Sequence, residues 1–286
     1  LVQRALALRL RFSAPVECAA PRALLRRSVA RSDVERAAAV FEAAGWRASR
    51  HDEDWIYKAY LGDYFVDLIF CSGNGIAAVD DAWFTKNNKK KPASLDDLTK
   101  PEYKNLMVAP GASSSSPGMA FFLATVGKYG ENGWKPYWTK LMSNGLKLTS
   151  GWSDAYEVDF TGSGKGKRPI VVSYDSSPAF TVDGAGKSTT SALGNTCFRS
   201  NEYAGVIKGA KNPEGAKAFI DFMNGKSFQK SLPDSMYVFP VDSNVELPKA
   251  WAANAKQPTK PIEVSPADID KNRSEWLTKW KDVTSK

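Results

Sequence analysis

Three short segments in the middle of the chain carry the residue types best suited to hold a small ligand. They are 113–118 (Ser-Ser-Ser-Ser-Pro-Gly), 151–156 (Gly-Trp-Ser-Asp-Ala-Tyr) and 172–178 (Val-Ser-Tyr-Asp-Ser-Ser-Pro). The first can start a helix and present backbone N–H groups that have no partner inside the helix. The other two place aromatic rings on turns beside small hydroxyl residues. Because a ring face attracts cations and stacks on planar molecules, this combination predicts a cleft for a flat, cationic, heteroaromatic ligand.

Residues that could catalyse a reaction or bind a metal are scarce. The one histidine, His51, lies in a charged run that predicts an exposed loop, and a Ser-His-Asp hydrolase would have to use it. The cysteines Cys18, Cys71 and Cys197 are too few and too far apart for a metal cluster or a disulfide framework. We therefore expect no catalytic residues, no metal site and no cofactor.

Two glycine-rich stretches imitate phosphate-binding loops. Residues 182–188 end in Gly-Lys-Ser, but Thr181 stands where the first glycine of the motif is required, and no strand leads directly into the stretch. Residues 162–167 also fail the spacing. Both are predicted to be surface loops.

The elements that position the three segments can be read from the surrounding pattern. Ser115 or Ser116 is expected to cap a helix with Pro117 at its first position, and apolar residues continue at helical spacing to Gly130. Residues 169–174 predict a buried strand. Since ligands in α/β proteins collect where such strands end, the residues that follow this strand become candidates for the site.

Length and charge set the broad class. At 286 residues the chain can form two domains or one two-lobed domain. No apolar run approaches the roughly 20 residues that a membrane span needs. The net charge of +8 comes from lysines scattered over polar surface, so we expect no nucleic-acid partner.

The composition changes along the chain. Residues 1–50 hold ten arginines and no lysine, whereas residues 85–286 hold three arginines and 25 lysines. This change suggests two genetic origins. Residues 1–31 have no clear period and are predicted to be disordered, and residues 32–84 read as a small α+β fragment.

Residues 32–84 resemble a bacterial nucleotidyltransferase-like family, chiefly through 64–70 (Tyr-Phe-Val-Asp-Leu-Ile-Phe) and 72–84. By that resemblance Asp67 would be one of three metal-binding carboxylates. The other two should come from an Asp-x-Asp on an earlier strand that follows a Gly-Ser turn, and neither feature lies upstream of Ser32. We therefore expect this fragment to be an inactive nucleotidyltransferase-like piece.

From about residue 79 to 286 the chain resembles the thiamine-binding, extracytoplasmic solute receptors of ABC importers. The narrowest signals are 115–118 and 151–156. Further matches lie at 94–98, 101–104, 172–174, 177–179, 212–214 and 237–241.

The resemblance implies six ligand-binding residues: Ser115, Ser116, Trp152, Tyr174, Ser177 and Phe180. The first two would hydrogen-bond to polar edges of the vitamin or to a phosphate on it. Trp152 and Tyr174 would contact its rings, and Ser177 would add a hydrogen bond. Phe180 stands where the family often has tyrosine, so the stacking surface is kept and a hydroxyl is lost.

The resemblance also implies a type II periplasmic-binding-protein-like α/β fold in residues 85–286. Lobe two would be complete at about 105–205, and lobe one would be partial at about 206–286. The expected partners are thiamine or its phosphates and an ABC permease, with the protein acting as a monomer in the periplasm. We do not expect the first twenty residues to act as an export signal, because Arg9 and Arg11 interrupt their apolar stretch.

Two expectations remain open at this stage. Thiamine binding should be weak, because the nucleotidyltransferase-like fragment occupies the place of the first half of lobe one. A receptor for another small cationic solute is the alternative, for example a polyamine, and ferric iron is a less favoured possibility because Tyr174 has no adjacent tyrosine.

Overall fold

The computed structural model describes residues 72–201, 204–206 and 210–285. The chain divides into two compact units. Gly73–Ser200 and Leu247–Lys286 form one, here called the sheet unit. The other, the helical unit, takes Asn201–Glu246 and the residues up to Ser72, nearly all of which lie outside the described ranges. Most of the small α+β fragment predicted at residues 32–84 also lies outside the described residues.

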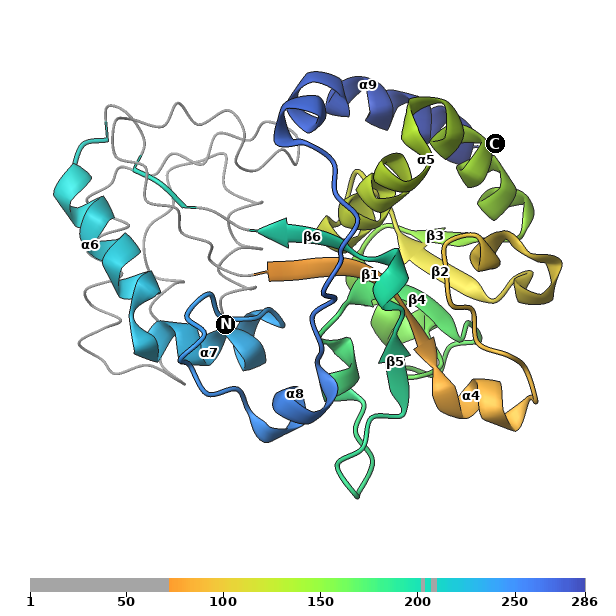
Figure 1. Cartoon of the computed structure of the whole chain (residues 1–286), viewed down its shortest axis with the longest axis horizontal. Helices are drawn as coiled ribbons and strands as arrows, with labels where there is room; N and C mark the ends of the chain where they lie inside the picture. Colours follow the sequence, from red (N-terminus) through yellow and green to blue (C-terminus); the bar gives the residue numbers. More distant parts are fainter. Residues whose placement is uncertain (1–71, 202–203, 207–209, 286) are drawn as a thin grey trace. The chain divides into compact units, whose positions relative to one another are not determined.

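A six-stranded mixed sheet forms the centre of the sheet unit (Figure 1). Its strands are β1 (Ser72–Asp80), β2 (Met107–Pro110), β3 (Lys147–Thr149), β4 (Ile170–Tyr174), β5 (Thr190–Ala192) and β6 (Phe198–Asn201). The order is β3-β2-β4-β1-β5, and β6 also pairs with β1. Strands β2, β3 and β4 are parallel, and β1 runs antiparallel to β4 and β5. The carboxyl ends of β2, β3 and β4 therefore share one edge with the amino end of β1; we call it the carboxyl edge.

Residues alternate between the two faces of this sheet, as the pleat of a strand requires. One face contributes Ala77, Val79, Met107, Ala109, Ile170 and Val172 to the main core. The opposite face contributes Ala78, Val108 and Val171 to a second, smaller cluster. The strand predicted at 169–174 is confirmed as β4, and its buried side chains pack into the clusters on both faces of the sheet.

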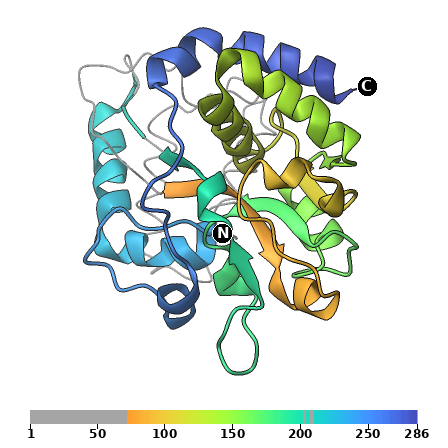
Figure 2. The same cartoon turned by 45° about the vertical axis from the view of Figure 1, so that its right-hand side comes forward.

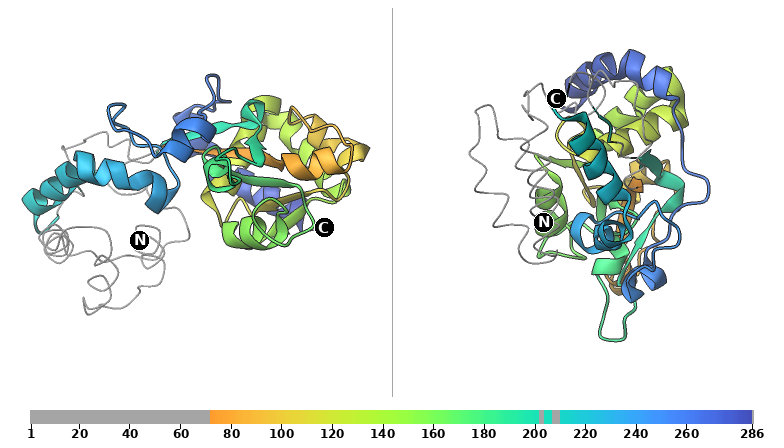
Figure 3. Two further views of the ribbon diagram at one scale, coloured as in Figure 1. Left: turned by 90° about the horizontal axis from the view of Figure 1, so that it is seen from below. Right: turned by 90° about the vertical axis from the view of Figure 1, so that its left-hand side faces the viewer.

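Helix α5 (Ser116–Ser143) covers the first face together with α9 (Pro266–Thr284). The two helices lie side by side in Figures 1 and 2 and in the right-hand view of Figure 3. The pattern predicted a helix as far as Gly130; in the structure α5 continues beyond this residue across a kink, where Gly130 has φ of +67°. Helix α5 begins at Ser116, so Pro117 takes its second position, and the Ser115 side chain makes no capping hydrogen bond.

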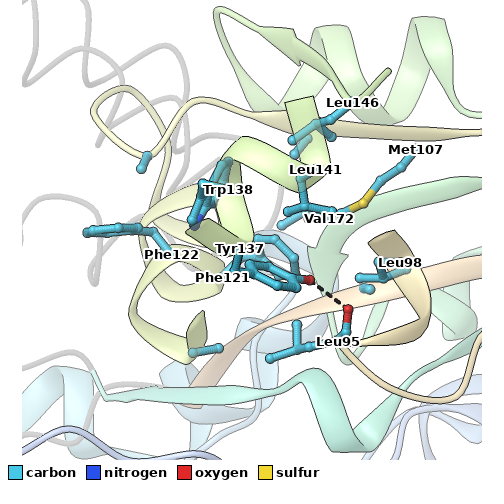
Figure 4. Packing of buried hydrophobic residues seen from close by; sticks show 14 of the residues in the cluster. Leu95, Leu98, Met107, Phe121, Phe122, Tyr137, Trp138, Leu141, Leu146 and Val172 are labelled. Atoms are coloured by element: carbon cyan, nitrogen blue, oxygen red, sulfur yellow. Dashed lines mark hydrogen bonds between the residues drawn. The ribbon is translucent and has the colours of Figure 1, made fainter. Parts of the chain in front are cut away.

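Aromatic side chains fill the core under α5. The rings of Phe122 and Trp134 meet edge to face at 5.1 Å, and those of Trp138 and Trp280 at 5.4 Å. Figure 4 shows Tyr137 among these residues, with its hydroxyl donating to the carbonyl of Leu95 over 2.8 Å. Such edge-to-face pairs stabilise a core beyond the area they bury. These contacts hold the two halves of α5 together and join α5 to α9.

Shorter elements complete the sheet unit. They are α4 (Asp81–Lys86), α8 (Lys249–Asn254) and single helical turns at Asp97–Thr99, Pro101–Tyr103, Ser177–Phe180 and Gly194–Thr196. The stretch 182–188 is a turn closed by a bridge between Val182 and Ser188, as predicted for a surface loop. The final segment rejoins the sheet unit where Ile262 N donates to Cys197 O over 2.7 Å.

The helical unit contributes α6 (Pro213–Asn224) and α7 (Lys226–Met236). Asn212 caps α6 by accepting from Gly215 N, and Pro213 takes the first position, which are places that asparagine and proline favour at a helix start. Ile220, Met223 and Leu232 pack between the two helices. Among the described helices of the whole chain, none is long and apolar enough to cross a membrane.

Candidate functional site

The three predicted segments meet at the carboxyl edge of the sheet. Residues 111–116 follow β2, residues 150–156 follow β3, and residues 175–178 follow β4. Gly111 N donates to Thr149 O over 3.0 Å, which joins the start of the serine run to the start of the tryptophan segment. This edge is where α/β sheets commonly hold ligands.

A chain of hydrogen bonds fixes the indole of Trp152. Its Nε1 donates to Ser173 Oγ over 2.8 Å. Ser173 is fully buried, and its Oγ lies 2.7 Å from Ser177 Oγ, which also accepts from Tyr174 N over 3.3 Å. The Ser177 hydroxyl is therefore engaged within the protein, and it supports the group that holds Trp152.

A second ring backs the indole. Trp152 and Tyr156 stack with centroids 4.8 Å apart and planes 13° from parallel. Tyr156 belongs to a single π-helical turn, Asp154–Asp159, and is 6% exposed, while Trp152 is only half-buried. Since Tyr156 packs with Val108 and Val171, the stack rests on the second face of the sheet.

Tyr174, at the end of β4, lies on the opposite face of the sheet from the stack of Trp152 and Tyr156. In the β1–β4 ladder Tyr174 pairs with Gly75. The pair two residues further along, Ala77 and Val172, belongs to the face covered by α5. The ring centroid of Tyr174 lies 6.0 Å from that of Trp152, at 53°. The two rings thus flank the end of β4 from its two sides.

Gly75 allows the start of α5 to pack closely against β1, near Tyr174. A Cβ at Gly75 would lie 2.4 Å from Ala120 Cβ and 2.7 Å from Pro117 O, so only glycine allows the helix to approach β1 so closely. Because Tyr174 is opposite Gly75, the first turn of α5 lies beside Tyr174. The serines at the head of α5 and the two aromatic rings therefore belong to one region.

The head of α5 has properties that suit a polar or anionic group. A helix start carries unpaired N–H donors and a partial positive charge. Ser115 Oγ is buried and makes no hydrogen bond to any residue that the structure describes, and Ser116 is exposed. A ligand oxygen at this position would meet donors that the described part of the protein does not use.

Phe180 packs against α8. It ends the helical turn Ser177–Phe180, is 41% exposed, and meets Trp251 of α8 edge to face at 5.8 Å. Of the six predicted residues, the structure links Trp152, Tyr174 and Ser177 through direct contacts and brings Ser115 and Ser116 beside them through Gly75. Phe180 is connected to them along the chain and packs toward α8.

Three residues of the region were not predicted. Ser173 and Tyr156 lay inside the quoted motifs, and the four-residue spacing between Trp152 and Tyr156 could have indicated their stacking. Strand alternation could have indicated that Ser173 faces away from Tyr174. The role of Gly75 depends on a contact with a helix over 40 residues later, which no local pattern reports. No group of three or more His, Cys, Asp or Glu side chains that could hold a metal occurs in the described ranges.

Comparison with known proteins defines the class. Residues 62–263 match the family model for bacterial extracellular solute-binding proteins. The "Thiamine-binding periplasmic protein" of Brucella melitensis is 33% identical over 199 residues, which is 68% of this chain and 58% of the relative. The Escherichia coli protein of the same name is 29% identical over 206 residues, covering 71% and 61% of the two chains. This chain thus spans about three-fifths of the length of these relatives.

Solved structures agree on the fold. A "Periplasmic thiamin binding protein" superposes with a TM-score of 0.64 at 25% identity, covering 81% of this chain and 69% of that one. Iron-bound HitA from Pseudomonas aeruginosa superposes with a TM-score of 0.57 at 18% identity, over 87% and 80% of the two chains, and so bears on the fold alone. The predicted type II periplasmic-binding-protein-like α/β class is confirmed. The chain belongs to the family of bacterial extracellular solute-binding proteins, which are not enzymes.

One expectation requires correction. The nucleotidyltransferase-like reading of residues 32–84 is not borne out, because the solute-binding family match begins at residue 62 and includes Asp67. In addition, β1 (Ser72–Asp80) lies between β4 and β5 in the sheet that carries the candidate site. Short runs of apolar strand residues occur in many folds, so the resemblance over 64–84 was not specific. Asp67 itself lies outside the described residues.

Proposed function

We propose that this chain binds thiamine or a thiamine phosphate outside the cytoplasm and delivers it to an ABC permease. The observation that carries the proposal is the half-buried Trp152 indole, fixed by Ser173 and Tyr156 beside Tyr174 at the carboxyl edge. Family membership supports the receptor class, and the ligand rests on the chemistry of this site together with the names of the relatives.

The chemistry of thiamine matches the side chains of the region. Its thiazolium carries a permanent positive charge, which an aromatic face attracts by about 0.5–2 kcal/mol. Its aminopyrimidine is flat and can stack on the second ring. Its hydroxyethyl group, or a phosphate attached there, would suit the donors of Ser115, Ser116 and the first turn of α5. Ser177 acts in this scheme by supporting Ser173, and Phe180 borders the region on the α8 side.

The relatives strengthen the choice of ligand without deciding it. Both curated relatives carry the name thiamine-binding, and their match covers more than two-thirds of this chain. Solute-binding proteins of one fold take different ligands, as the iron-bound neighbour illustrates. Another small cation, such as a polyamine, therefore belongs in the test as a competing ligand.

The proposal is tested with the full chain by thermal shift and isothermal titration. Thiamine, thiamine monophosphate and thiamine pyrophosphate are compared with putrescine and ferric citrate. A ligand that binds only the folded state raises the melting temperature by mass action. We expect a response to the thiamine compounds alone; a response to putrescine or iron only would overturn the proposal. Submicromolar affinity for thiamine would contradict the weak binding expected from the sequence.

A further inference from the structure

A polar hollow lies at the edge of the sheet opposite the candidate site. Its volume is about 520 Å³, and it is lined by Asn105, Lys147, Val158, Asp159, Lys165, Gly166, Lys167 and Arg168. Asn105 precedes β2, Lys147 begins β3, and Arg168 precedes β4. The hollow thus lies at the amino ends of the parallel strands, whereas Trp152 and Tyr174 lie at their carboxyl ends. Nothing in the thiamine proposal uses these residues.

The lining carries a strong excess of positive charge. Four basic side chains and one carboxylate give a net charge of +3 (four minus one). Asp159 is already paired, since Lys147 Nζ lies 2.7 Å from its Oδ1. Lys165 and Lys167 make no ion pair with any described carboxylate. Like charges repel in a shared hollow, so an anion placed among them would relieve that repulsion.

Arg168 is held rigidly in the lining. Its Nη1 donates to the carbonyls of Met107 and Gly145, each over 2.6 Å. These acceptors are neutral, so they fix the guanidinium without cancelling its charge. Its other N–H groups make no hydrogen bond to the described residues, and a guanidinium presents such donors in a planar fork that matches an oxyanion. Burial lowers the pKa of Arg168, and the charge of Asp159, which is itself paired with Lys147, opposes that shift in part.

The two unpaired lysines are presented by a tightly folded loop. A Cβ at Gly164 would lie 2.4 Å from Glu157 O, and one at Gly166 only 1.8 Å from Asp159 O. These glycines therefore let the loop lie directly on the backbone of the 157–159 segment. Lys165 stands between them and Lys167 follows, so the backbone positions of both lysines are fixed at the rim.

We propose that this hollow binds a phosphate-bearing ligand with two or more negative charges. A fixed guanidinium supplies directed hydrogen bonds, and two flexible ammonium groups can close on the remaining oxygens. The phosphate can belong to a soluble phosphate compound or to the headgroup of an anionic lipid, because the same chemistry recognises both.

The primary test is isothermal titration of the full chain with inorganic pyrophosphate at low ionic strength. The variant carrying Lys165→Gln and Lys167→Gln should bind pyrophosphate at least about tenfold more weakly, because hydrogen bonds to charged groups contribute more than hydrogen bonds between neutral groups. The control carries Lys135→Gln and Lys140→Gln, which remove the same charge from the exposed side of α5 and should leave the affinity unchanged. Added salt should weaken binding by screening.

A second arm distinguishes the source of the phosphate. Sedimentation with vesicles of phosphatidic acid, whose phosphomonoester can carry two negative charges, and phosphatidylcholine is compared with phosphatidylcholine vesicles alone. Loss of vesicle binding in the Lys165/Lys167 variant indicates a lipid headgroup, and loss of pyrophosphate binding alone indicates a soluble ligand. The proposal is overturned if neither probe binds, if the variant binds like the unmodified chain, or if the α5 control loses as much affinity. The variant should keep any thermal response to thiamine, so the two proposals can fail separately.

Discussion

In the proposed site, Trp152 is the residue on which ligand recognition should depend most directly. Its two faces are not equivalent: Tyr156 covers one at 4.8 Å, and the side chain remains only half-buried. Its ring edge is fixed by the hydrogen bond to Ser173. A ring whose orientation is fixed in this way loses little conformational freedom when a ligand contacts it, and this preorganisation favours binding.

Replacing Trp152 by alanine should remove the ring contact with the ligand. Stacking and the cation–π attraction together account for about 1–3 kcal/mol, so the Kd for thiamine should rise about tenfold or more. Trp152→Phe keeps a ring without the indole N–H and should lose less. Isothermal titration measures both, and equal affinity of the alanine variant and the unmodified chain would remove Trp152 from the site.

Replacing Ser173 by alanine tests the support behind the ring. The change removes the acceptor of the Trp152 N–H and leaves that donor without its partner, at a cost of about 1–3 kcal/mol if it stays buried. We expect both a lower free energy of unfolding and a several-fold rise in the Kd for thiamine. Ser153→Ala is the matched control, because Ser153 is exposed on the same segment. A loss of stability without any change in Kd would show that Ser173 matters only to the fold.

At the scale of elements, the site depends on how α5 meets the sheet. Two glycines allow the contact: Gly75 on β1, and Gly118 in the first turn of α5, where a Cβ would lie 2.5 Å from the carbonyl oxygens of Pro110 and Gly111. The helix head is therefore locked between the ends of β1 and β2. This arrangement presents Ser115 and Ser116 at the same edge as Tyr174.

Gly75→Ala should force β1 and α5 apart. The atoms that its Cβ would meet include backbone atoms, Pro117 O and Phe121 N, which cannot move alone. Overpacking of this kind typically costs about 1–3 kcal/mol. Gly184→Ala is the control, because a Cβ there would have open space. Urea unfolding should show a lower midpoint for Gly75→Ala only, and an unchanged midpoint would mean that the contact yields easily.

At the scale of the whole molecule, the chain leaves the sheet unit after Ser200 and re-enters it at Leu247. The returning segment is joined to the outgoing one near Cys197. The backbone of Ile262 donates to Cys197 O, and Arg199 Nη2 donates to Pro258 O over 2.7 Å. Cys197 is fully buried, and burial, followed by the nearby charge of Asp175, raises its pKa to about 12.

The buried thiol should report on opening of the sheet unit. An unfolded chain would have this thiol at its ordinary pKa of 9.0, so above that pH unfolding releases a proton that the native state retains. The contribution of Cys197 to stability is thus complete below about pH 9 and falls as the pH rises toward 12. Labelling at pH 8 with a thiol reagent, followed by peptide mass mapping, should leave Cys197 unmodified until denaturant is added. Rapid labelling of the native protein would contradict this burial.

The local sequence determined the elements and the residue types of the candidate site. Proline and serine at the start of α5, the apolar run of β4 and the Asn-Pro start of α6 are signals within a few residues, and the structure contains all three elements. The segment with Trp152 was likewise recognisable from its own composition. Such features follow from backbone capping, side-chain alternation and turn chemistry, which act over short distances along the chain.

Tertiary structure alone decided which of these residues meet. Ser173 supports Trp152 because the two lie on the same face of the sheet, 21 residues apart. Gly75 admits α5 because of a contact across 42 or more residues, and the basic hollow forms because parallel strands bring Asn105, Lys147 and Arg168 to one edge. These relations depend on strand order and helix packing. They arise from close packing between distant segments, which no local pattern encodes.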